Sequence, residues 1–279
     1  MRTAIPTSAA NAVRIRRSTP LAIWLAILVA LVGVIPPASA QVASGEPPAA
    51  GAAPAAQHTI FLPVARRSGG QALSGLPFDP FSTRHGQATY YDADGSGNCS
   101  FDPSPGDLMV AAMNDTDYVN AWLCGAYVEI TGPKGTVVVR IVDRCPECPS
   151  GNIDLSAEAF ARIADPIDGR VNIAWHLVSP ALSGPITYTF KDGSSKWWTA
   201  VQIRNHRNPI WRVEYRTSSG VFKEIPRQQY NYFVESSGMG DGPYTLRVTD
   251  IFGNVLTDTG IALVIGGEVA GKAQFPPMP

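Results

Sequence analysis

From about residue 84 to the C-terminus, the chain consists of short runs of β-forming residues separated by turn residues, with a single clear helical pattern. Gly86 to Tyr91 alternates, so Thr89 and Tyr91 share one face of an expected strand. A second alternating run extends from Val171 to Leu177. This texture predicts a mainly β fold.

One expected strand ends on an acidic residue. The run from Val137 to Val142 is strongly β-branched and stops at Asp143. If the strand is regular, Asp143 lies on the same side as Val139 and Ile141, because alternate residues share a face.

The helical pattern lies between Asp154 and Asp165. Ser156 can cap this helix, and Glu158 suits the positive end of the helix dipole. One helix among many short strands predicts a small, partly helical β-barrel up to about residue 180. The expected buried stripe of the helix consists of Leu155, Ala159, Phe160 and Ile163.

The chain has no helical pattern after Ser183-Gly184-Pro185. About 90 residues remain, which suffice for an immunoglobulin-like β-sandwich because such domains span ~100 residues. We expect an extended tail from Gly266 onward. The strand candidates are Ile186–Phe190, Thr199–Arg204, Ile210–Tyr215, Tyr244–Val248, Asn254–Thr257 and Ile261–Ile265.

Residues 1–40 have the pattern of a secretory signal peptide. Four arginines precede an apolar run from Leu21 to Ile35, and Ala38-Ser39-Ala40 is a cleavage signal. The apolar run is shorter than the ~20 residues of a spanning helix, although an uncleaved N-terminal anchor is the alternative. Cleavage after Ala40 leaves 18 basic and 23 acidic residues, a net charge of −5.

Residues 41–83 are rich in Ala, Pro, Gly and Ser, apart from one apolar island at residues 60–64, and are expected to form a disordered linker. The chain has a net charge of −1 and no basic block beyond its N-terminus, so we expect no nucleic-acid partner. The single long apolar run excludes a multi-span transporter.

Export exposes the four cysteines to an oxidising compartment, where an even number allows two disulfides in three pairings. A zinc site is the weaker alternative, because Cys99 and Cys124 do not form a second closely spaced pair beside Cys145-Pro-Glu-Cys148. A thioredoxin-type motif opens a helix, whereas Pro149 follows here. We therefore expect structural disulfides and no bound metal or cofactor.

Two carboxylates flank the second cysteine pair. Asp143 follows a strand and Asp154 precedes a helix cap, so both can lie at one edge of the barrel. Paired carboxylates suit general acid and base roles at a glycosidic bond, and Thr89 and Tyr91 could add hydroxyl donors. Alternatively, both aspartates bond loop amides, as is common beside caps and strand ends.

The second candidate cluster is aromatic and lies in the sandwich region. Two adjacent tryptophans, Trp197 and Trp198, point to opposite faces of a regular strand, so one of them would be in the core. Both can be exposed only if the chain bulges or turns there, and Asp192-Gly193 just upstream favours a turn. A row of exposed rings including Tyr230 would suit the flat face of a polysaccharide.

The segments that carry a family resemblance are residues 87–91, 97–99, 124–130, 142–149 and 153–160 in the first region, and 191–198, 201–206, 229–233 and 248–253 in the second. Segments of the first region resemble the first domain of expansins and loosenins, and segments of the second region look like the second domain of bacterial expansins. Over roughly residues 84–275, the sequence therefore resembles the expansin family.

The resemblance implies a six-stranded double-psi β-barrel over residues 84–182 and an immunoglobulin-like carbohydrate-binding module over residues 183–275. It places Asp154 on the family's activity-essential aspartate and Asp143 and Thr89 on polar groove residues. The implied aromatic platform comprises Trp197, Trp198 and Tyr230, with Lys191 beside it.

The resemblance also favours a Cys99–Cys124 disulfide, which leaves Cys145–Cys148 as the second bridge. Two positions depart from the family pattern. Tyr91 stands where some bacterial members have a small hydroxyl residue, and Cys145 replaces a groove tyrosine, as in loosenins. The chemistry of the groove is open at these two positions.

By resemblance, we expect a secreted, monomeric protein that binds cellulose, other cell-wall polysaccharides or peptidoglycan and loosens the wall without hydrolysis. Related endoglucanases have a separate base aspartate that this pattern lacks, and we expect Asp143, the one nearby substitute, to be misplaced. A glycan-cleaving enzyme on the same barrel and a plain wall adhesin are the alternatives.

Overall fold

The computed structural model describes residues 74–279. The predicted signal peptide at residues 1–40, and the predicted linker as far as residue 73, lie outside the described residues. The described chain is mainly β, as its sequence texture predicts. No helix between residues 74 and 279 is long and apolar enough to cross a membrane.

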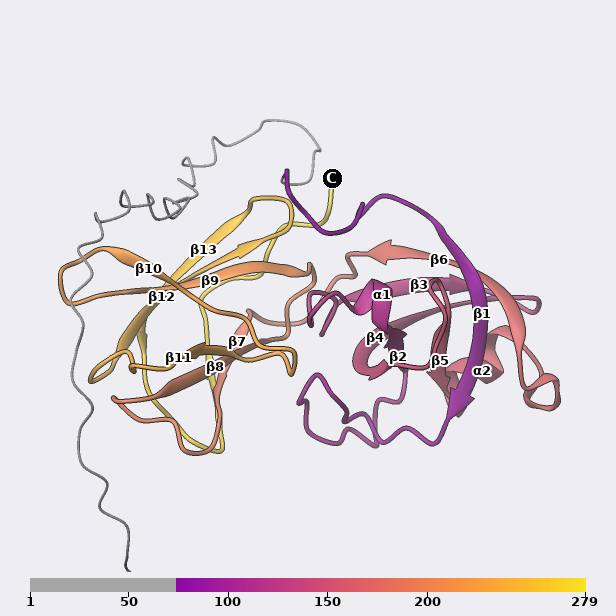
Figure 1. Cartoon of the computed structure of the whole chain (residues 1–279), viewed down its shortest axis with the longest axis horizontal. Helices are drawn as coiled ribbons and strands as arrows, with labels where there is room; N and C mark the ends of the chain where they lie inside the picture. The colour runs from indigo at the N-terminus through magenta and orange to yellow at the C-terminus, as the bar shows by residue number, and fades with distance from the viewer. Residues whose placement is uncertain (1–73) are drawn as a thin grey trace, which may run out of the picture. The chain divides into compact units, whose positions relative to one another are not determined.

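Six strands close into a barrel in the order β1-β5-β2-β4-β3-β6 (Figure 1). The β1–β5 and β2–β4 pairs are parallel, and the other four pairs are antiparallel. Strand β2 therefore lies between β4 and β5. The strands are β1 (Arg84–Tyr91), β2 (Val110–Asn114), β3 (Tyr127–Thr131), β4 (Thr136–Cys145), β5 (Ile153–Ser156) and β6 (Val171–Val178).

The main helix of the barrel, α2 (Ala157–Ile163), begins after Ser156. The Ser156 hydroxyl accepts a hydrogen bond from the Ala159 amide at 3.0 Å, as the sequence predicts. Phe160 and Ile163 are fully buried. The helix is shorter than the predicted segment because residues 153–156 pair as β5. Two short helices, α1 (Asp115–Tyr118) and η1 (Pro166–Asp168), complete the barrel.

Strand β4 contains an irregularity that decides where Asp143 points. Ala111 of β2 pairs with Ile141, but the next residue, Ala112, pairs with Asp143. Val142 is the extra residue of a β-bulge and is as deeply buried as Ile141. Asp143 therefore lies on the outer face, opposite to Ile141. The prediction for a regular strand is wrong because the bulge reverses the alternation.

The second region contains two four-stranded sheets, with strand orders β10-β9-β12-β13 and β11-β8-β7-β14. Both sheets contribute to one apolar core, in which Tyr188, Val213 and Leu246 are fully buried. The strands are β7 (Thr187–Phe190), β8 (Thr199–Arg204), β9 (Ile210–Arg216), β10 (Phe222–Ile225), β11 (Phe233–Glu235), β12 (Tyr244–Asp250), β13 (Val255–Ile261) and β14 (Glu268–Ala270).

The observed strands differ from the prediction at the C-terminal end. A single strand, β13, replaces the two strands expected over residues 254–257 and 261–265. Gly260 has a φ of +81°, and the register between β12 and β13 shifts beside it, so the strand continues through an irregular step. The tail expected to be simply extended contains β14, which pairs with β7.

Candidate functional site

Four residues on four neighbouring barrel strands lie at one level. Thr89 of β1 pairs with Asp154 of β5, which pairs with Ala112 of β2, which pairs with Asp143 of β4. Directly paired residues share a face, so these four form a line on the outside of the barrel, called here the carboxylate row. The two acids are two strand spacings apart, about 10 Å between their backbones.

Asp154 is held by its neighbour in the carboxylate row. The Thr89 hydroxyl donates a hydrogen bond to Asp154 Oδ1 at 2.5 Å. Burial raises the pKa of Asp154, the Thr89 hydrogen bond opposes this shift, and the negative charges of Glu147 and Asp143 add to it. The carboxyl therefore keeps its proton to a higher pH than a free aspartate and can then donate a hydrogen bond.

Asp143 is bound mainly by backbone amides. Its Oδ1 accepts hydrogen bonds from the Asn98 amide at 2.6 Å and from its neighbour Arg144 at 2.8 Å. Gly97 packs directly against it, since a Cβ there would lie 2.4 Å from that of Asp143. Asp143 therefore accepts hydrogen bonds from loop amides and also belongs to the carboxylate row.

Tyr91 lies at the end of β1, close to the two acids. Burial raises the pKa of Tyr91, and the charges of Asp143, Asp154 and Asp94 raise it further. Its hydroxyl is buried and makes no hydrogen bond within residues 74–279. Tyr91 thus faces the carboxylates with its hydroxyl covered, which makes it less accessible to a ligand than the sequence prediction assumes.

A third acid belongs to this site, and sequence reasoning gave it no role. Glu147 is exposed, and its charge affects Asp154 more than that of Asp143 does. The expectation that Asp143 is the one acid near Asp154 is therefore wrong, because Glu147 is also near it. Glu147 lies between the cysteines of the Cys145–Cys148 disulfide, on the loop that joins the strands of Asp143 and Asp154. Its position between these two cysteines was the sequence signal that could have identified Glu147 as a site residue.

The cysteines form two disulfides, Cys99–Cys124 and Cys145–Cys148, the pairing that the family resemblance favours. Cys145 is buried and disulfide-bonded, so it offers no free polar group to a ligand. Within residues 74–279 no three His, Cys, Asp or Glu side chains are grouped as ligands for a metal ion.

Trp197 and Trp198 lie in a tight turn before β8, so neither is in the core. Ser195 and Trp198 form a bridge, and the Ser195 amide donates to the Trp198 carbonyl at 2.7 Å. Trp197 is 73% exposed and Trp198 is half-buried. The turn that the sequence requires for exposure of both indoles is present. We refer to Trp197, Trp198 and Tyr230 as the aromatic surface.

Tyr230 and Lys191 lie together. Tyr230 is half-buried, and its ring centroid is 6.0 Å from that of Tyr232. The ammonium group of Lys191 lies 5.3 Å from the Tyr232 ring and 6.0 Å from the Tyr230 ring, within the range of a cation–π interaction. Within residues 74–279, no hydrogen bond or ring contact joins these residues to the tryptophan turn or to the carboxylate row.

A family model for the double-psi β-barrel, described as lytic transglycolase, matches residues 83–175. The chain is 40% identical to Expansin-YoaJ of Bacillus subtilis over 201 residues, which cover 68% of this chain and 86% of that protein. Expansin-like protein 2 of Dictyostelium discoideum is 32% identical over 187 residues, which make up 63% of this chain. This chain spans 45% of that relative, less than half of its length.

Among solved structures, a point variant of Clavibacter michiganensis expansin in complex with cellohexaose matches with a TM-score of 0.66 and 35% identity. The match covers 70% of this chain and 99% of that one. It therefore includes both the barrel and the two-sheet region.

Proposed function

The chain belongs to the expansin family, and from this premise we propose that it binds cellulose or a related cell-wall glycan and loosens it without hydrolysis. We propose two functional parts, a double-psi barrel over residues 84–182 and an immunoglobulin-like carbohydrate-binding module over residues 183–275. The complex of Clavibacter expansin with cellohexaose supports a cellulose-type ligand.

The observation that carries this proposal is the exposure of Trp197 beside Trp198 in a tight turn. Folded chains normally bury such large rings because each removes 150–250 Å² from water. An exposed Trp197 beside a half-buried Trp198 fits a ligand with a flat apolar face, and the C–H face of a pyranose ring has that character. Tyr230 and Lys191 extend this binding surface.

The carboxylate row supplies the complementary polar contacts. Protonated Asp154 can donate a hydrogen bond to a glycan oxygen, and Thr89 and Asp143 can bond neighbouring hydroxyls. One glucan chain bound by both groups of residues exchanges its contacts with other glucan chains for contacts with the protein. Chains can then slip past one another without any covalent step.

A second candidate function is glycan cleavage, favoured by the lytic transglycolase description of the barrel family and by the raised pKa of Asp154. An aspartate with a raised pKa keeps its proton to a higher pH than a free aspartate, which suits the role of a general acid. Cellulose is the ligand of the first proposal, and peptidoglycan is a substrate for the second.

The experiment that separates these functions is a paired assay on one preparation. Paper weakening, retention on insoluble cellulose or peptidoglycan, and release of reducing ends or anhydro-sugars are measured together, for the parent and Asp154→Asn. The proposal predicts loss of weakening, unchanged retention and no released sugar. Sugar release that Asp154→Asn abolishes would establish the lytic function, and weakening that survives Asp154→Asn would leave an adhesin.

We also propose that the protein is secreted as a monomer after cleavage following Ala40, with residues 41–83 as a linker. The family's action on cell walls supports an extracellular location. Mass spectrometry of the protein from culture medium tests the cleavage site, and light scattering tests the monomer.

A further inference from the structure

We propose that Asn98 is a positioning residue that ties Tyr230 of the aromatic surface to the carboxylate row. The Asn98 amide donates to Asp143 Oδ1 at 2.6 Å. Its side-chain Nδ2 donates to the Gln229 carbonyl at 3.0 Å and to the Tyr118 hydroxyl at 2.9 Å. One residue thus contacts a carboxylate and the backbone next to Tyr230. The inference rests on the proposed function, in which both groups bind one glycan.

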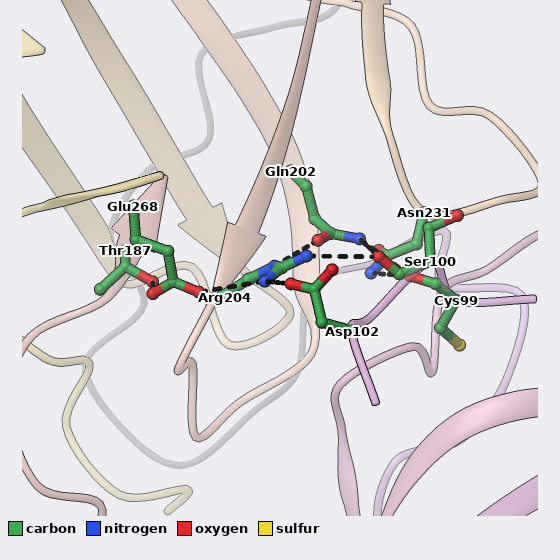
Figure 2. A network of polar contacts seen from close by, with 8 residues as sticks. All are labelled: Cys99, Ser100, Asp102, Thr187, Gln202, Arg204, Asn231 and Glu268. Carbon is green, nitrogen blue, oxygen red and sulfur yellow. Dashed lines mark hydrogen bonds and ion pairs between the residues drawn. The ribbon is translucent and has the colours of Figure 1, made fainter. Parts of the chain in front are cut away.

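Tyr230 is fixed from both sides by groups of the barrel. On one side, the Gln229 carbonyl accepts a second hydrogen bond, from the Tyr118 hydroxyl at 2.7 Å. On the other side, Asn231 Nδ2 donates to the Cys99 carbonyl at 3.2 Å (Figure 2). The backbone before and after Tyr230 is therefore bonded to the barrel.

The barrel groups that make these contacts are themselves held firmly. Cys99 is joined to Cys124 by a disulfide, and its amide donates to the carbonyl of the bulge residue Val142 at 3.0 Å. Tyr118 is almost fully buried, and burial raises its pKa to about 12, so its hydroxyl stays protonated and can donate. The barrel groups that position Tyr230 are thus themselves held in place by a disulfide and by hydrogen bonds.

A separate group of contacts surrounds the same loop and would remain if Asn98 changed. Gln202 Nε2 donates to the Cys99 carbonyl at 2.8 Å, and the Arg204 guanidinium bonds Asp102 at 2.6 Å and Glu268 at 3.1 Å (Figure 2). Loss of the Asn98 side chain is therefore expected to loosen the Tyr230 segment without separating the barrel from the second region.

The test variant is Asn98→Ala, which removes Nδ2 but keeps the amide that bonds Asp143. We expect paper weakening to fall at least threefold while cellulose retention stays within twofold of the parent. Hydrogen exchange in residues 226–233 should accelerate, with the barrel peptides unchanged. Tyr118→Phe removes the second bond to Gln229 and should act in the same direction. The matched control is Asn172→Ala, an exposed asparagine of β6.

Two outcomes would overturn the role of Asn98. One is unchanged weakening and exchange in both Asn98→Ala and Tyr118→Phe, and the other is faster exchange throughout the barrel, which indicates a purely structural role. Asp154→Asn is measured in the same series. If it keeps full weakening, the proposed function fails. If it loses weakening while Asn98→Ala does not, only the inference about Asn98 fails, and the exchange data test the positioning of Tyr230 in either case.

Discussion

The carboxylate row and the aromatic surface differ in how the fold builds them. Thr89, Asp154 and Asp143 lie on paired strands, partly buried and hydrogen-bonded, whereas Trp197 lies on a turn and is largely exposed. A group whose charge state matters needs a fixed position that is partly shielded from solvent, and strand register provides such a position. A group that works through contact area needs access, and a turn provides that.

The largest expected difference concerns covalent bracing, because both disulfides lie in the barrel and none lies in the two-sheet region. Replacing Cys99 and Cys124 by serine should lower the free energy of unfolding by about 3.5 kcal/mol, and replacing Cys145 and Cys148 by about 1.5 kcal/mol, because the shorter loop constrains the unfolded chain less. Urea unfolding monitored by hydrogen exchange measures both. An equal loss of protection in the two regions would show that they unfold as one unit.

A second prediction uses one glycine from each region. A Cβ at Gly97 would overlap the Asp143 side chain, and a Cβ at Gly238 would lie 2.0 Å from the Lys196 carbonyl oxygen, beside Trp197. Both glycines have positive φ. We expect Gly97→Ala and Gly238→Ala each to cost about 1–3 kcal/mol of stability.

The functional losses of these two variants should differ. Gly97→Ala should reduce paper weakening with cellulose retention preserved, and Gly238→Ala should reduce retention. The two assays are run on both variants at a temperature where each is folded, with circular dichroism as the control. Identical losses would mean that the two groups do not act separately.

The third prediction concerns ring contact alone. Trp197→Ala combined with Trp198→Ala should weaken retention on crystalline cellulose severalfold, about 1 kcal/mol, because the stacking area is lost. Pull-down isotherms provide the measurement. Ile167→Ala is the matched control, since Ile167 is 93% exposed and belongs to the barrel. Retention equal to that of the parent would remove the aromatic surface from the binding site.

The smallest expected effect is a pH dependence of stability in the barrel. The pKa of Asp154 is raised in the folded state, so its contribution to stability is present below the pKa of unfolded aspartate and is lost as pH rises through the folded pKa. Asp154→Asn stays neutral and can still accept the Thr89 hydrogen bond. The melting temperature of Asp154→Asn should therefore rise relative to that of the parent as pH rises from 4 to 7. The tryptophan double variant should follow the parent throughout, and a constant difference for Asp154→Asn would contradict the burial of this carboxyl.

Much of the architecture could be predicted from local patterns. Strand β8 has the predicted bounds, and the cap of α2 is the predicted serine. Strands β10, β11 and β14 have three or four residues each and were not predicted, because so short a run carries no clear alternation. Their pairing partners, which lie far away in the sequence, determine them.

The candidate site could be located from the sequence where residue type and the family resemblance pointed to it, as with Asp154 and the tryptophan pair, whose functional roles stay predictions. It was not predictable where geometry carries the chemistry. Asn98 acts through three hydrogen bonds to residues up to 131 positions away, and Glu147 through its place on a closed loop. Neither relation leaves a periodic signal in the chain.

The bulge at Val142 has a practical meaning for engineering this barrel. Because Val142 is accommodated as an extra residue, two consecutive apolar side chains, Ile141 and Val142, are both buried while Asp143 stays on the outer face. Deleting Val142 would place Asp143 directly after Ile141, so the acid would still point outward, but the interior would lose one apolar side chain. Designers who graft this strand between homologues must therefore keep the bulge together with its additional residue, because a regular strand of the same length would point Asp143 into the interior.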